Sequence, residues 1–234
     1  MGVARRRPPE RLDELALCAI EVFSERGYRR TQMADVARRL GVSPGALYGY
    51  VESKEALFDL AVRRAFGEAL DAAALPLRVP EPGVLLRHVR GAMQRQIRRS
   101  SLDASLARPA PRDVAAELTM LLGELYDGLA RNAAALRLLE ASARDRPDLA
   151  ELYFARGRAG LIDRLRRYLE RRIREGRLRP VPDVAVAARL ALESVAWFAW
   201  HRLGDPAPQA MDDALARETV IDVLARGLLP GGSP

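Results

Sequence analysis

The sequence predicts an all-α protein, and three observations support this fold class. Ala, Leu and Arg dominate the 234 residues while β-branched residues are scarce, a composition that favours helix. Apolar residues recur with a period near 3.6 through most of the chain, and glycines and prolines separate the periodic segments. No segment shows a competing strand pattern. Apolar residues make up 49% and charged residues 29%, so the chain can bury a sizeable globular core.

Two helices are expected after a flexible, basic and proline-bearing arm over residues 1–9. The first covers residues 10–26 and stops at Gly27, since glycine readily adopts the conformation that ends helices. Its buried face is expected to comprise Leu12, Leu15, Ala16, Ala19, Ile20 and Phe23. The second begins with Thr31 as its N-cap and ends at Gly41. Its apolar stripe is expected to comprise Met33, Val36, Ala37 and Leu40.

A third and a fourth helix follow after short turns. Ser43 is expected to cap the third helix, with Pro44 at the first position, where a missing N–H is tolerated. Its inward side is marked by Leu47 and Val51. Ser53 is expected to cap the fourth helix, whose buried face comprises Leu57, Leu60, Ala61 and Ala65. A proline-rich linker over residues 75–83 follows, so we expect one small domain over residues 10–74.

The rest of the chain predicts five longer helices, over residues 83–100, 111–141, 147–175, 183–203 and 209–228. We expect them to form a second domain over residues 83–229, followed by a disordered tail over residues 230–234. Residues 184–200 are unusually apolar, but the charges of Arg189 and Glu193 outweigh their preference for a bilayer. This segment is better interpreted as a helix buried against a partner surface.

The second and third helices have the pattern of a helix-turn-helix, because a tight glycine turn joins two short helices and the later one exposes small and polar residues. Such a motif places its second helix in the major groove of DNA. The net charge of +7 permits a polyanionic partner, but most of the excess lies beyond residue 75. The motif, and not the charge, therefore supports DNA binding.

Residues 31–57, with the sequence TQMADVARRLGVSPGALYGYVESKEAL, resemble the DNA-binding signature of the TetR family of bacterial transcriptional regulators. The resemblance extends upstream through Ala19, Phe23, Gly27 and Tyr28, and it covers about the first quarter of the chain. It implies that the third helix reaches the bases while the tyrosines and the start of the fourth helix hold phosphate. The positions that carry these roles here are Thr31, Ser43, Pro44, Gly45, Ala46, Tyr48, Tyr50 and Lys54.

The chemistry of these residues agrees with the implied roles. A helix N-terminus attracts phosphate, and Lys54 adds a cation to the first turn of the fourth helix. The phenols of Tyr48 and Tyr50 can donate to phosphate oxygens, although simple packing is the alternative for either ring. Pro44, Ala46 and Gly49 replace a lysine, a threonine and an arginine that are frequent in the family, so the third helix offers no bidentate arginine. Specificity is then expected from Arg29, Arg30 or Gln32, or from DNA shape read by the arginines at positions 5–7.

The resemblance also implies a dimer formed by the last two helices and a ligand cavity among the helices of the second domain. The interface is expected to involve Leu192, Val195, Ala199, Val220 and Leu224. The candidates for the cavity are Met93, Ile97, Met120, Leu121, Tyr126, Tyr153, Phe154 and Trp197. For each of the latter, ordinary core packing is the alternative.

Other classes of function lack support in the sequence. Cys18 is the only cysteine and is expected to be a small buried residue, and the two histidines are far apart, so neither a disulfide nor a metal or other cofactor is expected. The pattern GVSPG at residues 41–45 matches a hydrolase motif, but a helix and not a strand precedes it. We expect a cytoplasmic protein that is not an enzyme and does not bind membranes.

The expected function is that of a homodimeric repressor that binds operator DNA and is released by a small effector of unknown identity. Two alternatives stay open at this point. The first is an activator or a co-repressor-dependent regulator of the same fold. The second is a helical ligand carrier or enzyme in which the helix-turn-helix is vestigial.

Overall fold

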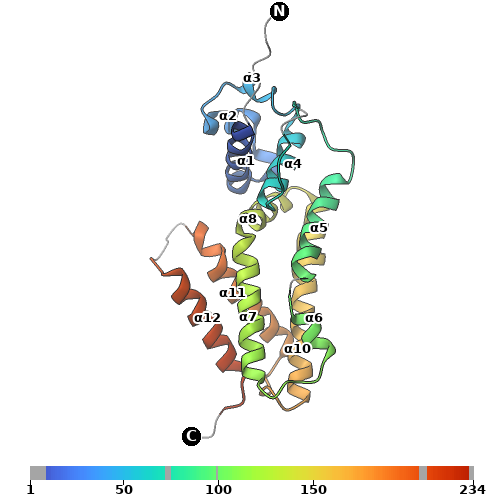
Figure 1. Ribbon diagram of the computed structural model, residues 1–234, viewed down its shortest axis with the longest axis vertical. Coiled ribbons are helices and arrows are strands. Elements are labelled where there is room, and N and C mark those ends of the chain that lie inside the picture. Colours follow the sequence, from blue (N-terminus) through green and yellow to red (C-terminus); the bar gives the residue numbers. More distant parts are fainter. Residues whose placement is uncertain (1–8, 72–74, 99, 206–209, 232–234) are drawn as a thin grey trace, which may run out of the picture. The chain divides into compact units, whose positions relative to one another are not determined.

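The computed structural model describes residues 9–71, 75–98, 100–205 and 210–231, and over these ranges the protein is all-α, which confirms the predicted fold class. Residues 5–7 of the expected arm and residues 232–234 of the expected tail lie outside these ranges. The helices of the N-terminal part are α1 (Pro9–Arg30), α2 (Met33–Leu40), α3 (Pro44–Leu47), α4 (Lys54–Ala65) and α5 (Val84–Arg98). The next are α6 (Leu102–Ala107), α7 (Val114–Arg131), α8 (Ala133–Ala143) and α9 (Pro147–Ala150). The π-helix η1 (Glu151–Arg158), α10 (Ala159–Arg174), α11 (Val184–Ala199), the short η2 (His201–Gly204) and α12 (Asp213–Leu228) complete the chain (Figure 1).

The chain divides into two compact units, which differ from a simple N-terminal and C-terminal division. The first unit comprises Met1–Met93 together with Ala134–Tyr153, and the second comprises Gln94–Ala133 together with Phe154–Pro234. The first unit therefore contains α1–α4 and most of α5. It also contains α9 and nearly all of α8, which follow α4 by about seventy residues in the sequence.

The core of the first unit forms where α1 packs on α2 and α4. The predicted inward face of α1 is buried throughout, because its apolar residues follow the helical period. Phe23, Tyr28 and Phe58 form an aromatic cluster with ring centroids 4.9 Å apart for Phe23 and Phe58 and 5.0 Å apart for Tyr28 and Phe58. Cys18 is half-buried and not fully buried as expected, and burial raises the pKa of its thiol.

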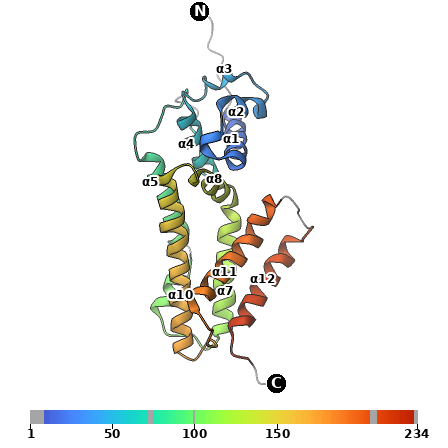
Figure 2. The same ribbon diagram turned by 180° about the vertical axis from the view of Figure 1, so that it is seen from behind.

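In the second unit α7 packs on α11 and α12, and α10 packs on α6 and α11. Figures 1 and 2 show α11 and α12 side by side along α7. The guanidinium of Arg172 on α10 is fully buried and donates to both carboxylate oxygens of Glu117, at 2.8 and 2.9 Å. Tyr168 donates to the same carboxylate at 2.9 Å, so these bonds satisfy a charge that would be costly if unpaired.

The helix boundaries depart from the prediction in four places. Residues 111–141 form two helices, because α7 ends at Arg131 and Asn132 is its C-cap, with a side-chain amide that donates to the carbonyl of Gly128 at 2.7 Å. Residues 147–175 begin with α9 and the π-helix η1 before α10, and α6 was not predicted. Gln32 and not Thr31 is the N-cap of α2. Ser53 caps α4 as expected, since its hydroxyl accepts from the N–H of Ala56 at 3.2 Å.

None of the helices in the described ranges is both long and apolar enough to cross a membrane.

Candidate nucleic-acid interface

A left-handed glycine makes the turn between α2 and α3. Gly41 has a φ of 74°, and its N–H donates to the carbonyl of Arg38 at 3.2 Å. The N–H of Val42 donates to the carbonyl of Ala37 at 3.0 Å, which closes the end of α2. Residues with a side chain are disfavoured at this φ, so Gly41 sets the direction in which the chain leaves α2 toward α3.

The short helix α3 buries one side and exposes the other. Leu47 is fully buried, as the sequence predicted. Val51 is also fully buried, but it lies beyond the end of α3 and not on this helix as expected. Ser43, Pro44, Gly45 and Tyr48 are exposed, and Tyr48 is 52% exposed. Ala46 and Tyr50 are half-buried. This arrangement is typical of a helix-turn-helix, whose second helix is anchored on one side and offers the other to DNA.

Thr31 has a different place from the one expected. Its side chain is buried, and its hydroxyl donates to the carbonyl of Gly27 at 2.8 Å. The residue therefore ties the end of α1 to the start of α2 and does not present its hydroxyl on the surface. Gln32 is exposed beside it, and the N–H of Gln32 donates to the carboxylate of Asp35 at 3.0 Å.

Lys54 is half-buried and links α4 to the connection between α1 and α2. Its Nζ donates to the carbonyl of Arg29 at 3.1 Å and lies 4.6 Å from the centroid of the Tyr28 ring. Burial lowers the pKa of this ammonium. An ammonium has three N–H donors and the bond to Arg29 uses one of them, so a contact with phosphate is still possible.

The segment that follows α8 holds the same connection from its other side. The carboxylate of Asp145 accepts from the N–H of Arg29 at 2.6 Å. Both the N–H and the carbonyl of Arg29 are thus bound, the first by Asp145 and the second by Lys54. A Cβ at Gly27, which has a φ of 75°, would lie 2.9 Å from the carbonyl oxygen of Ala141, so only glycine permits this approach.

Sequence reasoning missed Asp145, because it lies 116 residues from Arg29 and no local pattern marks it. Arg146, its neighbour, lies 5.1 Å from the centroid of the Tyr28 ring. The hydroxyl of Tyr28 donates to Glu55 at 2.7 Å. The contacts that hold the connection between α1 and α2 therefore include Asp145 and Arg146, from a distant part of the sequence. We call these contacts the anchor of the helix-turn-helix.

The proposed ligand candidates occupy several environments. Met93 and Tyr153 belong to the first unit and the other six to the second. Leu121, Tyr126 and Tyr153 are buried, and Tyr126 also donates to the carbonyl of Phe198 at 3.1 Å. Met93, Ile97 and Phe154 are half-buried. Met120 and Trp197 are 45% and 39% exposed. For all eight residues, a role in ligand binding stays a prediction.

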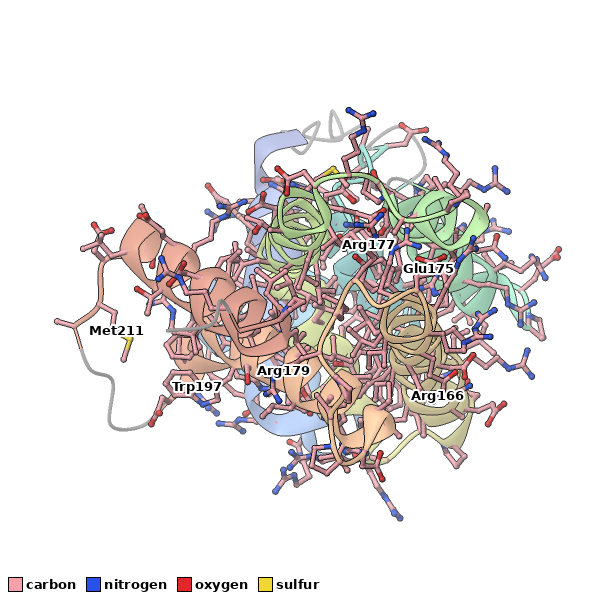
Figure 3. The ribbon with its side chains drawn as sticks, turned by 90° about the horizontal axis from the view of Figure 1, so that it is seen from below. Arg166, Glu175, Arg177, Arg179, Trp197 and Met211 are labelled. Carbon is pink, nitrogen blue, oxygen red and sulfur yellow. The ribbon has the colours of Figure 1, made fainter. Side chains whose placement is uncertain are left out.

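The predicted dimer residues lie mostly in the core of the chain itself. Leu192, Val195, Ala199 and Val220 are buried within the chain, and Leu224 is half-buried. They pack inside the second unit, in which α11 contacts α7, α10 and α12, and α12 contacts α7. The same helices expose another apolar set, which consists of Val186, Leu190, Trp197, Leu215 and Val223. Figure 3 shows Trp197 at the outer edge of the unit.

Two family models match this chain. The model of bacterial regulatory proteins of the tetR family matches residues 18–61, which contain the helix-turn-helix. The model of the AefR-like transcriptional repressor C-terminal domain matches residues 129–226. Together they account for more than half of the chain.

Individual proteins agree with these models. The HTH-type transcriptional repressor KstR2 of Mycolicibacterium smegmatis is 35% identical over 78 residues, which are 30% of this chain and 38% of that protein. The match thus spans well under half the length of this relative. The structure of the ketosteroid transcriptional regulator KstR2 of Mycobacterium tuberculosis has a TM-score of 0.59 at 19% identity, over 98% of this chain and 100% of that one. A tetR-family regulatory protein from Rhodococcus RHA1 has a TM-score of 0.53 at 18% identity, over 95% and 99% of the two chains.

The two structural likenesses concern the fold alone, whereas the family models identify both the helix-turn-helix and the later helices. The helix-turn-helix found in the structure lies inside the first matched range. The chain belongs to the TetR family of bacterial transcriptional regulators.

Proposed function

We propose that this protein is a sequence-specific DNA-binding repressor that acts as a homodimer and leaves its operator when a small ligand binds. The observation that carries the proposal is the two-sided character of α3. Its buried Leu47 fixes the helix, and Ser43, Pro44, Gly45 and Tyr48 form a free surface beside it. Small residues on that surface permit close approach to base edges, and the phenol of Tyr48 can donate to phosphate.

The outer face of α11 and α12 supports the homodimer. Val186, Leu190 and Trp197 recur along one side of α11, and Leu215 and Val223 do so on α12. An apolar helix face exposed to water is unfavourable, and a second copy of the same face would cover it with two-fold symmetry. This set replaces the buried residues that the sequence suggested.

Release by a ligand supplies the regulatory step. A ligand that binds more tightly to a conformation unable to hold both half-sites shifts the dimer off DNA. The KstR2 structure bears the name of a ketosteroid regulator, which makes ketosteroids the first class of compound to test. A regulator of this kind acts on chromosomal DNA, so we place it in the cytoplasm.

The test is a binding titration with labelled duplexes from the region upstream of the gene that encodes the protein. The wild type should protect two half-sites about one helical turn or more apart, because the symmetry of the dimer is repeated in the operator. A mixed-sequence duplex of equal length is the control. Equal affinity for both duplexes at every salt concentration would contradict the proposal.

Transcription from a template with the protected site separates the two regulatory alternatives. A repressor lowers the transcript level and a ligand restores it. An activator raises the level, and a co-repressor-dependent regulator lowers it only when the ligand is present.

A further inference from the structure

The connection between α4 and α5 returns to the end of α3 and does not act as a free linker. We call residues 75–79 the strap. The N–H of Leu77 donates to the carbonyl of Tyr50 at 2.7 Å, and the N–H of Glu52 donates to the carbonyl of Leu77 at 3.0 Å. Val51 and Leu77 form a parallel bridge, the one isolated bridge in the described part of the chain. The strap is thus bonded to the segment between α3 and α4 (Figure 1).

A third hydrogen bond fixes the far end of the strap. The N–H of Val79 donates to the Glu52 carboxylate at 2.6 Å. Arg78 therefore stands between two residues whose backbones are both bonded to residues 50–52. In an extended strand neighbouring side chains point to opposite sides. Leu77 is half-buried and Arg78 is exposed, which agrees with this alternation.

The surroundings of α3 have few cations for DNA phosphates. No Lys or Arg occurs in residues 41–53. The guanidinium of Arg39 is paired with Glu21 at 2.6 Å and with Glu25 at 2.9 Å. Lys54 donates to a backbone carbonyl with one of its three N–H groups, and the other two are left for phosphate. In contrast, no carboxylate of the described ranges pairs with Arg78.

We infer that the strap is part of the DNA-binding surface and that Arg78 binds a backbone phosphate next to Tyr48 and Tyr50. The guanidinium fits this ligand because its planar set of donors matches phosphate oxygens in pairs. The bond from Val79 to Glu52 uses one oxygen of the only acidic side chain in residues 41–53, which reduces its repulsion of the same phosphate. The inference rests on the proposed function, since it assigns a further contact to the same DNA.

The test compares the salt dependence of DNA binding by the wild type, Arg78→Gln and Arg90→Gln. Arg90 is exposed on α5 in the same unit, so its replacement makes the same change of charge away from the strap. Each lost phosphate contact lowers the slope of log K against log salt by about 0.9, or about 1.8 for a dimer. Over a fourfold rise in salt, the affinity of the wild type should then fall about tenfold more than that of Arg78→Gln.

Arg90→Gln should keep the wild-type slope. The inference is overturned if Arg78→Gln has the same slope as Arg90→Gln. It is also overturned if the Leu77 amide exchanges with solvent as fast as an unstructured residue, since the strap would then not be bonded to Tyr50. If the wild type binds the upstream duplex and the mixed-sequence duplex with equal affinity, the proposed function fails. The salt slopes of the variants on the mixed-sequence duplex still decide whether Arg78 binds phosphate. Absence of any DNA binding at low salt would overturn both.

Discussion

Replacing Asp145 should weaken DNA binding although it removes a negative charge from a DNA-binding protein. The carboxylate accepts from the N–H of Arg29 at 2.6 Å and favours the charged form of Lys54, which binds the carbonyl of Arg29 at 3.1 Å. Without Asp145, only the bond from Lys54 to the carbonyl of Arg29 holds the connection between α1 and α2. Simple electrostatics predicts the opposite result, because one fewer carboxylate would reduce repulsion of the phosphates.

The size of the effect follows from the bond that is lost. A hydrogen bond to a charged group contributes about 1.5–3 kcal/mol, and this one is exposed, which places it at the lower end. If most of that free energy serves to position α2 and α3, Asp145→Ala should bind operator about tenfold more weakly. Asp145→Asn should bind with intermediate affinity, because its amide oxygen can still accept from Arg29.

Fluorescence anisotropy with a labelled operator measures these affinities, and Glu81→Ala is the matched control. Glu81 is an exposed acid in the same unit, so its loss makes the same change of net charge. Thermal unfolding should first show that all variants are folded. A folded Asp145→Ala that binds operator as tightly as Glu81→Ala would refute the positioning role.

Three further predictions concern other parts of the chain. If the proposed dimer forms through this face, Leu190→Arg should be a folded monomer in sedimentation, since this side chain is 59% exposed. Val195→Arg should instead unfold the protein, because Val195 is fully buried. A dimeric Leu190→Arg would move the interface elsewhere. Lys54→Ala should weaken specific and non-specific DNA binding alike and flatten the salt slope by about 1.8 per dimer; an unchanged slope would leave the bond to Arg29 as its role. Arg172→Met should lower the free energy of unfolding by about 3–5 kcal/mol in urea at pH 7, because it leaves Glu117 buried without its partner. Burial alone would raise the pKa of Glu117, but the hydrogen bonds from Arg172 and Tyr168 outweigh burial and lower this pKa. The wild type should therefore lose stability as the pH falls below 4.5, the ordinary pKa of this group. Arg172→Met should lose less stability over the same range, because it lacks the bond that lowers the pKa.

The local part of the fold could be predicted from the sequence because its signals are local. The stripe of α1, the glycine turn at Gly41 and the serine cap of α4 each depend on residues within one or two turns. The exposed surface of α3 followed from the same patterns.

The orientation of α11 could not be predicted, and the reason is physical. This helix is apolar on two sides, with Leu192 and Val195 on one and Val186 and Leu190 on the other. Periodicity shows that both apolar sides of such a helix are expected to be buried. It does not show which side packs in the core of the same chain and which is left for a partner. The sequence suggested the side that the chain itself buries, and the exposed side is the one we propose for the dimer.

The strap and Asp145 stayed hidden for another reason. A proline-rich stretch predicts a linker, and only tertiary contacts show that Leu77 bonds to Tyr50. Likewise, nothing near Asp145 in the sequence points to Arg29. Contacts between distant segments depend on the whole fold, which a single sequence read locally does not provide.

The inclusion of Ala134–Tyr153 in the first unit has a consequence for folding during synthesis. An N-terminal domain usually folds as soon as it leaves the ribosome, at about 5–20 residues per second. Here α1–α4 leave early, but Ala141 and Asp145, which approach Gly27 and bind Arg29, are made much later. The nascent chain therefore carries an incomplete helix-turn-helix anchor for several seconds. A chimera that takes only its first 74 residues from a relative would lose the contacts of Ala141 and Asp145 with Gly27 and Arg29. Such a chimera should therefore take residues 134–153 from the same relative.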